Sequence, residues 1–285
     1  MKVALCAIAK NENNYIREWV EHHLKLNFDI IYLLDNNDID GEHFEEVIGD
    51  YIDSKKVIII NKRGIRNAQI SSYDEFYKGI AKQYDWVGFW DIDEFLFLEE
   101  DKDIQSFINQ KRFLECNTIV INWKYYDDND LICVENNNYS VLERFKNPGK
   151  ISGNESEYGK RLVKTNIVGL TINSSHGPIV DPDFGEVNEN ATVPNTVLKT
   201  LNAAGEPIEY NSCKIDKPTH KFAHLRHYRF KTIEEYITNK MKRGYPTLYL
   251  NEGRDMNIFD FFMLNEKTDE KLRWISLYRR SQKKK

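Results

Sequence analysis

Four short apolar runs in the first third of the chain are separated by stretches with helical spacing of apolar residues. The runs are Val3–Ala9, Ile30–Leu34, Val57–Ile60 and Trp86–Trp90. Apolar runs of this length are typical of buried strands. Strands that alternate with helices form right-handed βαβ units around a parallel sheet. The chain is therefore predicted to be an α/β protein, whose ligand would bind at the carboxyl ends of these strands.

Helices are predicted between these strands and again near the end of the chain. The helical stretches are residues 16–24, capped by Asn13 or Asn14, and residues 44–52 and 69–84. Further predictions are strands at 118–123 and 161–163, an irregular segment at 177–212, and a helix from Thr232 that Gly244 can end. The remainder, to about residue 280, is expected to be helical. We therefore divide the chain into a domain at 1–230 and a C-terminal helical add-on at 231–285.

Composition argues against several classes of protein. The 285 residues carry a formal net charge of −5, which gives no overall case for nucleic-acid binding. The four cysteines form no Cys-x-x-Cys pair, and no apolar run reaches membrane-spanning length or precedes a secretory cleavage site. We therefore expect a soluble cytoplasmic protein. Its basic tail, Arg279–Lys285, is a candidate for peripheral contact with an anionic membrane surface, with a solvated terminus as the alternative.

The pair Asp91 and Asp93 stands apart from the other Asp-x-Asp pairs in the sequence. The others, in polar and turn-like surroundings, are Asp38/Asp40, Asp101/Asp103, Asp128/Asp130 and Asp181/Asp183. Asp91 and Asp93 instead follow an apolar strand, where alternation would point both carboxylates to one face and Glu94 to the other. Two such carboxylates suit a hard divalent cation that keeps positions open for phosphate oxygens. The alternative is a polar strand terminus.

An ordered set of short motifs extends over roughly residues 1–243. In chain order they are Lys10–Glu12, Glu18–His23, Asp35–Asn36, Asp91–Phe95 and His227–Lys231. Together they resemble glycosyltransferase family 92, a family 2-like group of the DUF23 type. The resemblance implies a GT-A fold, that is, a Rossmann-like mixed sheet flanked by helices, and a nucleotide-sugar donor. Trp123–Asp127 stands where the family often has Trp-x-x-Phe-Gly, a departure on the acceptor side.

The resemblance places the donor site at the ends of the predicted strands. Asp35 would bind the base or ribose, and the helix start at Asn11 and Glu12 would favour phosphate. The expected nucleotide-sugar-binding residues are Ala9, Lys10, Asn11, Glu12, Asp35, Asn36, Gln69, Tyr73, Asp91, Ile92, Lys160 and Lys231. Helix capping is the alternative for Asn11 and Glu12, and core packing is the alternative for Tyr73.

The expected catalytic residues are Asp93, Asp91 and Glu94. Asp93 would contact Mn²⁺ or Mg²⁺ directly, and Asp91 would bind ribose or a metal-bound water. GT-A enzymes often add a histidine ligand, so the expected metal ligands are Asp91, Asp93, His176 and His227. Arg229 and Lys231 could hold the diphosphate. The candidates for the acceptor's base are Glu94, Asp127, Asp128 and Glu186, and the sequence does not choose among them.

The resemblance and the motifs lead to one expected function and two alternatives. We expect a metal-dependent, inverting glycosyltransferase that moves a hexose, galactose first and glucose second, from a UDP-sugar to a glycan acceptor. The setting would be surface polysaccharide or glycoprotein glycan assembly. A metal-dependent nucleotidyltransferase or phosphohydrolase is disfavoured because the Gly-rich phosphate loop is missing. A non-catalytic nucleotide-sugar-binding module is disfavoured by the intact Asp91/Asp93 pair.

Overall fold

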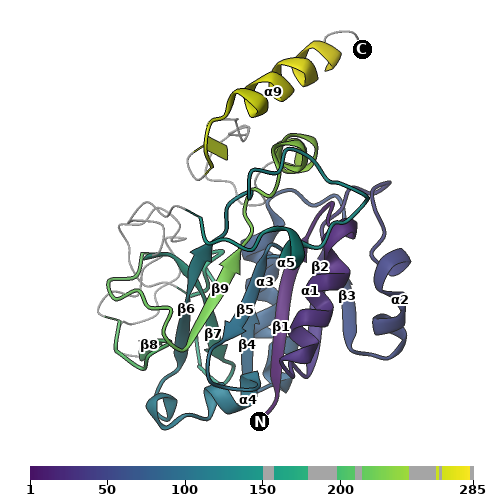
Figure 1. Ribbon diagram of the computed structural model, residues 1–285. Helices are drawn as coiled ribbons and strands as arrows, with labels where there is room; N and C mark the ends of the chain where they lie inside the picture. The colour runs from purple at the N-terminus through teal and green to yellow at the C-terminus, as the bar shows by residue number, and fades with distance from the viewer. Residues whose placement is uncertain (150–156, 179–197, 209–213, 244–260, 263–264, 283–285) are drawn as a thin grey trace.

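The computed structural model describes residues 1–149, 157–178, 198–208, 214–243, 261–262 and 265–282 (Figure 1). Its described part is built on one curled sheet of nine strands with the order β3-β2-β1-β4-β7-β6-β9-β5, and with β8 paired to β6. The strands are β1 (Val3–Ala9), β2 (Ile30–Asp35), β3 (Val57–Asn61), β4 (Trp86–Phe89), β5 (Glu94–Leu98), β6 (Thr118–Tyr125), β7 (Gly159–Lys164), β8 (Thr200–Asn202) and β9 (Ala223–His227). The predicted class, a mixed α/β sheet flanked by helices, is confirmed.

The first four strands are parallel, as their apolar sequences predict. β1 lies between β2 and β4, and β3 is at the edge beside β2. The register pairs Ala9 with Asp35 and Asp35 with Asn61 at the carboxyl ends. Three loops therefore leave the sheet at one edge, and this common exit positions the site described below.

Helices cover both faces of this parallel part. They are α1 (Asn13–Lys25), α2 (Glu45–Asp53) and α3 (Ala68–Lys78), followed by a 3₁₀ turn at Ile80–Gln83. The alternating side chains of β1 explain the two layers, because Leu5 and Ala7 pack with α1 while Cys6 and Ile8 pack with α3. The predicted helix at 69–84 was too long, because Gly79 ends α3 with φ −108° and ψ −94°. The predicted cap of α1 was also wrong, since Glu12 holds the cap position without a side-chain cap bond.

The second half of the sheet is mainly antiparallel. β7 pairs antiparallel with β4 and β6, and β5 pairs antiparallel with β9. β6 and β7 match the strands predicted at 118–123 and 161–163, whereas β5 and β9 were not predicted. β9 has two histidines and an arginine in five residues, so it lacks the apolar run that predicts a buried strand. Short helices complete this half at α4 (Ile104–Ile108), Lys111–Phe113 and α5 (Val141–Arg144).

The C-terminal residues pack against the far end of β6. A helix runs through α6 (Ile233–Glu235), a π-helical turn η4 (Tyr236–Lys240) and α7 (Met241–Arg243), and α9 (Asp269–Gln282) lies beyond it at the top of Figure 1. A separate apolar cluster joins Tyr125 of β6 to Tyr236 and Ile275. The helix predicted from Thr232 is confirmed as far as Arg243, whereas Gly244 lies outside the described residues. Most of the segment 177–212 also lies outside them, and its described part contains strand β8, where an irregular chain was predicted. The boundary at residue 230 remains a prediction.

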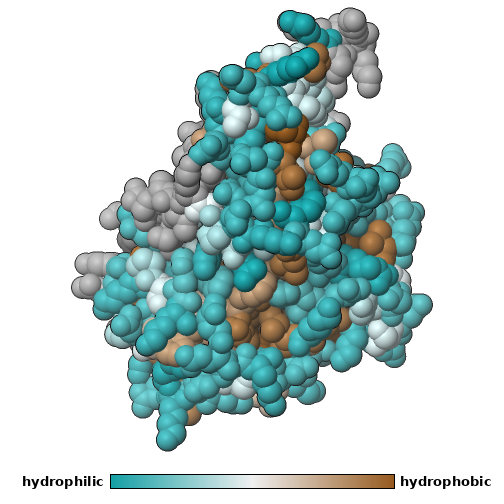
Figure 2. All heavy atoms as spheres, in the orientation of Figure 1, coloured by the Kyte–Doolittle hydropathy of each residue, from teal (hydrophilic) through white to brown (hydrophobic). Residues whose placement is uncertain are grey.

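The visible surface is mainly hydrophilic, and Figure 2 shows its hydrophobic side chains in separated groups. Within the described ranges, every helix is too short or too polar to span a bilayer.

Candidate functional site

A cavity of about 900 Å³ opens where β1, β2 and β4 end. Its lining includes ten of the residues that the sequence assigned to the site: Ala9, Lys10, Glu12, Asn36, Gln69, Asp91, Ile92, Asp93, His176 and His227. The remaining assigned residues are not part of this lining: Asn11, Asp35, Tyr73, Glu94, Lys160 and Lys231. The cavity therefore brings together motifs from the beginning, middle and end of the chain.

Asp91 and Asp93 lie in the turn between β4 and β5, rather than at the end of a strand. Asp91 accepts hydrogen bonds from Gln69 Nε2 at 2.9 Å and from Lys160 Nζ at 2.8 Å. Lys160 is buried, and it also donates to the carbonyl oxygen of Ser175 at 2.8 Å. Both carboxylate oxygens of Asp91 are therefore bonded within the protein.

Asp93 is buried and has different partners. Its Oδ2 lies 2.6 Å from Lys240 Nζ, and its Oδ1 lies 3.5 Å from His227 Nε2. Burial alone would raise the pKa of Asp93, but the charge of Lys240 and the contact with His227 outweigh burial and hold this pKa well below its ordinary value. Asp93 is therefore an ionised carboxylate inside the protein.

Among the described residues, the group that could hold a metal ion is Asp93, Glu94 and His227. One donor atom from each lies within 4.8 Å of the other two. Glu94 Oε1 is buried without a hydrogen-bond partner, so one carboxylate of this set has an unused acceptor atom. Two carboxylates and an imidazole suit Mn²⁺. The residues present therefore fit a divalent cation.

This set differs from the one expected from the sequence. Glu94 lies beside Asp93, so the prediction that it points to the other face was wrong. The turn at Asp91–Asp93 breaks the alternation on which that prediction depended. Asp91 is absent from the set because Gln69 and Lys160 hold it. Burial raises the pKa of Glu94 well above its ordinary value, although the charge of Lys160 at 3.7 Å opposes the shift.

His176 lines the cavity but is not part of the three-residue set. Its Nδ1 lies 2.9 Å from the carbonyl oxygen of Gly159, so Nδ1 carries the proton and Nε2 keeps its lone pair. Its ring packs on Trp123 at a centroid distance of 5.1 Å and on Tyr158 at 6.0 Å. Burial and the nearby charge of Lys160 lower its pKa to about 3. His176 is therefore a neutral imidazole at the aromatic end of the cavity.

The opposite end of the cavity is formed by the loops after β1 and β3. Asp35 is buried behind the lining, and its carboxylate accepts hydrogen bonds from Arg63 Nη1 at 2.7 Å and from Asn37 Nδ2 at 2.8 Å. Asn11 has a left-handed φ of 55°, and its N–H donates to Asn37 Oδ1 at 2.8 Å. The sequence did not single out Gly64–Asn67, which lines this end. Asp35 thus shapes this wall through its neighbours.

Tyr73 and Lys231 occupy positions outside the cavity. Tyr73 is fully buried, and its hydroxyl accepts a hydrogen bond from the N–H of Ile8 at 3.3 Å. This geometry matches core packing, the alternative given for Tyr73. Lys231 adopts a φ of 58°, and its ammonium lies 4.1 Å from the ring centroid of Tyr15. It faces a smaller cavity that adjoins the first.

The described candidates for the acceptor's base, Glu94, Asp127 and Asp128, are not part of the cavity lining. Asp128 is buried and paired with Lys271 at 2.5 Å, whereas Asp127 accepts from the N–H of Asn129 at 3.1 Å. Glu186 lies outside the described residues, and Glu94 belongs to the metal-capable set. The described residues therefore do not single out a base.

The helix formed by α6, η4 and α7 (the C-terminal helix) contributes two cavity residues that were not predicted from the sequence, Lys240 and Arg243. Arg243 pairs with Glu12, and its Nη1 donates to the carbonyl oxygen of Lys10 at 3.1 Å. Asn239 Nδ2 donates to the carbonyl oxygen of Asn11 at 3.0 Å. The helix after residue 232 therefore contacts the loop after β1 directly. No local pattern marks these residues, because only the folded chain brings them to the cavity.

Comparison with known proteins supports the resemblance based on the motifs. No family model matches the chain. Two curated relatives do match: a glycosyltransferase family 92 protein of Oryza sativa subsp. japonica, 26% identical over 104 residues, and one of Ricinus communis, 26% identical over 110 residues. The resemblance to glycosyltransferase family 92 is confirmed. The alignments cover 36% and 39% of this chain, and the chain spans only 18% and 20% of these family 92 proteins.

Solved structures of other proteins also align with this chain. Residues 1–349 of S. aureus TarS align over 85% of this chain and 64% of that chain, with 13% identity and a TM-score of 0.42. The same protein in complex with UDP-GlcNAc aligns over 71% and 58%, with 13% identity and a TM-score of 0.40. The mannosyltransferase PcManGT of Pyrobaculum calidifontis, in complex with GDP-Man and Mn²⁺, aligns over 42% and 35%, with 9% identity and a TM-score of 0.30.

Proposed function

We propose that the protein is a metal-dependent glycosyltransferase that takes a hexose from a UDP-sugar. The observation that carries this proposal is the cavity at the strand ends, where the lining residues Asp93 and His227 form a metal-capable set with the buried Glu94, beside several cationic side chains. The family 92 relatives support the reaction class. For the metal we propose Mn²⁺, with Mg²⁺ as the second choice, held by Asp93, Glu94 and His227.

Cationic side chains that could face a diphosphate line the cavity, and Lys10, Lys240 and Arg243 are each paired with a carboxylate in this structure. Arg66, Arg229, Lys240 and Arg243 line it together with Lys10. Fixed positive charges in a partly buried site stabilise the negative charge that a departing nucleoside diphosphate develops. A bound divalent cation would supply further Lewis-acid stabilisation of the same charge. These residues therefore bind the leaving group and hold it in place.

The two ends of the cavity suggest where the parts of the donor bind. The wall at Gly64–Asn67 lies beside the Asp35 loop, where we place the uracil and ribose. Trp123, Tyr125 and Tyr158 line the other end, and flat aromatic faces are suitable surfaces for sugar rings. We place the hexose and the acceptor there. Galactose is our first choice and glucose our second.

For the wider setting we keep the expectations drawn from the resemblance. The reaction would invert the anomeric centre, and the acceptor would be a glycan in surface polysaccharide or glycoprotein glycan assembly. The proposed location is cytoplasmic, with peripheral membrane contact through the basic residues Arg279–Lys285.

Release of UDP from a panel of UDP-sugars tests the function. We expect slow hydrolysis of one UDP-hexose with Mn²⁺, and we expect this hydrolysis to be lost with chelator and in Asp93→Ala. Asp130→Ala is the control, because Asp130 belongs to another Asp-x-Asp pair and its side chain is 78% exposed. Absence of UDP binding with Mn²⁺ present would overturn the proposal and favour a nucleotidyltransferase or phosphohydrolase. Metal-dependent UDP binding without turnover of any donor, with or without glycan acceptors, would indicate a binding module.

A further inference from the structure

Lys240 forms the closest ion pair of Asp93. Its Nζ lies 2.6 Å from Asp93 Oδ2, and the same ammonium donates to the carbonyl oxygen of Arg229. The two residues are 147 positions apart in the sequence. The pair is largely buried, with 15% of the Lys240 side chain and 5% of the Asp93 side chain exposed. The ammonium group of Lys240 is thus paired with Asp93, one of the two carboxylates of the metal-capable set.

The backbone that carries Lys240 is fixed to the donor side of the cavity. Lys240 is the last residue of the π-helical turn Tyr236–Lys240, a rare form of helix that is frequent at functional sites. Asn239 and Arg243, on either side, bond to the carbonyl oxygens of Asn11 and Lys10. The backbone of Lys240 is therefore held in place. Its flexible four-carbon side chain can change position while the helix stays where it is.

A divalent cation and the Lys240 ammonium need the same carboxylate. A metal bound through Asp93, Glu94 and His227 would lie within bonding distance of Asp93. Two cations on one buried carboxylate repel each other strongly, because the surroundings screen charge poorly. Since Lys240 also lines the cavity, its released ammonium would stay beside any bound diphosphate.

We propose that Lys240 is an exchangeable counter-ion of Asp93, which a divalent cation displaces and which then binds a phosphate group of the nucleotide-sugar. This inference rests on the proposed function and deepens it. It makes the C-terminal helix part of the donor site. It also makes metal binding and diphosphate binding cooperative, because the metal releases the lysine that the phosphate needs.

Two affinities measured on Lys240→Met test the exchange. Mn²⁺ binding without nucleotide is followed by electron paramagnetic resonance, and UDP binding is followed by calorimetry at saturating Mn²⁺. We expect Mn²⁺ to bind at least about 10-fold more tightly, because a competing charge is gone, and UDP to bind at least about 10-fold more weakly. A merely structural role would weaken both affinities. Weaker or unchanged Mn²⁺ binding, or unchanged UDP binding, would overturn the proposal.

Lys10→Met is the matched control, since Lys10 lines the same cavity but pairs with Asp38 at 2.7 Å. It removes the same charge without touching Asp93, so its Mn²⁺ affinity should stay within about 3-fold of the wild type. If Lys10→Met raised the Mn²⁺ affinity as much as Lys240→Met, the loss of one positive charge anywhere in the cavity would explain the result. The exchange proposal would then be overturned. The Mn²⁺ titration needs no sugar donor, so it can succeed even if no UDP-sugar is turned over.

The wild-type protein provides a test that does not depend on the folding of a variant. Reductive methylation of lysines, read by mass spectrometry, reports how free each ammonium group is. We expect Lys240 to react faster when Mn²⁺ is added and slower again when UDP follows. A Lys240 reactivity that Mn²⁺ leaves unchanged would mean that the metal does not displace it.

Discussion

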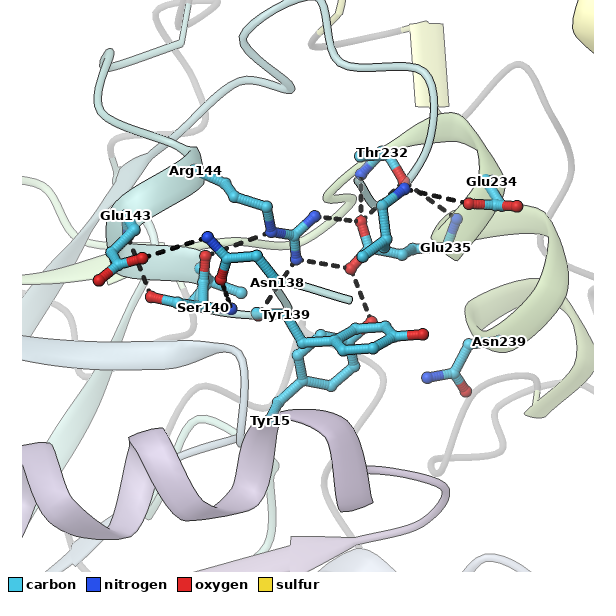
Figure 3. Close-up of polar contacts among 12 residues, drawn as sticks. Tyr15, Asn138, Tyr139, Ser140, Glu143, Arg144, Thr232, Glu234, Glu235 and Asn239 are labelled. Carbon is cyan, nitrogen blue, oxygen red and sulfur yellow. Dashed lines mark hydrogen bonds and ion pairs between the residues drawn. The ribbon is translucent and has the colours of Figure 1, made fainter. Parts of the chain in front are cut away.

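The hydroxyl group of Tyr15 donates a hydrogen bond of 2.7 Å to Oε1 of Glu235, across a sequence separation of 220 residues. Arg144 donates to the same carboxylate from both terminal nitrogens, at 2.8 and 2.7 Å. Thr232 adds bonds from its N–H and its hydroxyl, at 3.0 and 2.7 Å. Figure 3 shows Glu235 between these three partners, where α1, α5 and the C-terminal helix meet. Glu235 therefore anchors the helix that carries Lys240.

Glu235→Gln should strongly destabilise the protein. The change removes the negative charge from a buried group and leaves Arg144, whose side chain is 7% exposed, without a counter-ion. We expect a loss of about 3–5 kcal/mol in the free energy of unfolding, measured by urea denaturation. Tyr15→Phe removes one hydrogen bond and should cost about 1 kcal/mol.

Glu75→Gln makes the same chemical change at an exposed ion pair. Glu75 pairs with Lys62 at 2.5 Å, and its side chain is 72% exposed. Solvent already screens this pair, so the loss should be below about 1 kcal/mol. Similar losses for Glu235→Gln and Glu75→Gln would contradict the anchoring role of Glu235.

Glu94→Gln and Asp91→Asn should differ in their effect on metal binding. Glu94 belongs to the set with Asp93 and His227, whereas both oxygens of Asp91 are bonded to Gln69 and Lys160. We expect Glu94→Gln to weaken Mn²⁺ binding at least about 100-fold and Asp91→Asn about 10-fold or less, as for a residue outside the metal's own ligands. Electron paramagnetic resonance gives both affinities. The reverse order would restore the ligand set expected from the sequence.

The sequence was sufficient where the signal is local. The parallel strands follow from apolar runs, and the Asp91/Asp93 pair stood out because an apolar strand precedes it. The cavity lies where strand ends meet at one edge of the parallel sheet, which is where the sequence placed the candidate site. These features depend on short stretches of chain and on rules that hold for any sheet of this kind.

The remainder depends on contacts that local patterns do not encode. The direction of the Glu94 side chain is set by a turn. The strand β9 exists because its residues pair with β5 and β6. Lys240 reaches Asp93 from a helix that is held by Glu235 and by bonds to the loop after β1. The sequence presents Asp35 as a ligand-binding carboxylate, yet this carboxylate accepts a hydrogen bond from Arg63, 28 residues further along the chain. Each of these contacts joins residues that are far apart in the sequence and come together only in the folded chain.

Gly159→Ala should severely destabilise the protein, because the backbone at this position leaves no room for a side chain. A Cβ there would lie 2.2 Å from the carbonyl oxygen of Ile121 on the neighbouring strand. The strand pair β6–β7 would have to separate, and with it the wall that carries Lys160 and His176. We expect a loss of at least about 3 kcal/mol, or failure to fold, measured by thermal denaturation.

Gly49→Ala is the matched control for the same substitution. Gly49 lies in α2, and a Cβ there would have no neighbour within 4 Å. Alanine is favoured over glycine in a helix, so this variant should gain about 0.5–1 kcal/mol. We expect the free energy of unfolding to fall in Gly159→Ala and to rise in Gly49→Ala. Comparable losses of stability at both positions would refute the steric argument for Gly159.

His23 should make the protein less stable as the pH falls below about 6.5. Its ring is fully buried between the sheet and α1, where Nδ1–H donates to the carbonyl oxygen of Trp19 at 2.8 Å. Its Nε2 accepts a hydrogen bond from the N–H of Leu96 at 3.3 Å. Both ring nitrogens are thus used by the neutral form, and burial holds the pKa of His23 well below its ordinary value.

The sign of the effect follows from the lowered pKa. Above about pH 6.5 His23 is neutral in both the folded and the unfolded chain. Below this pH the unfolded chain binds a proton that the folded chain refuses, so its contribution to stability falls by up to about 1.4 kcal/mol per pH unit. His23→Phe removes the titrating group and should flatten this part of the curve, although it loses both hydrogen bonds. Urea denaturation of wild type and variant from pH 8 to pH 5 measures the difference. Parallel curves would show that His23 takes up its proton without loss of stability.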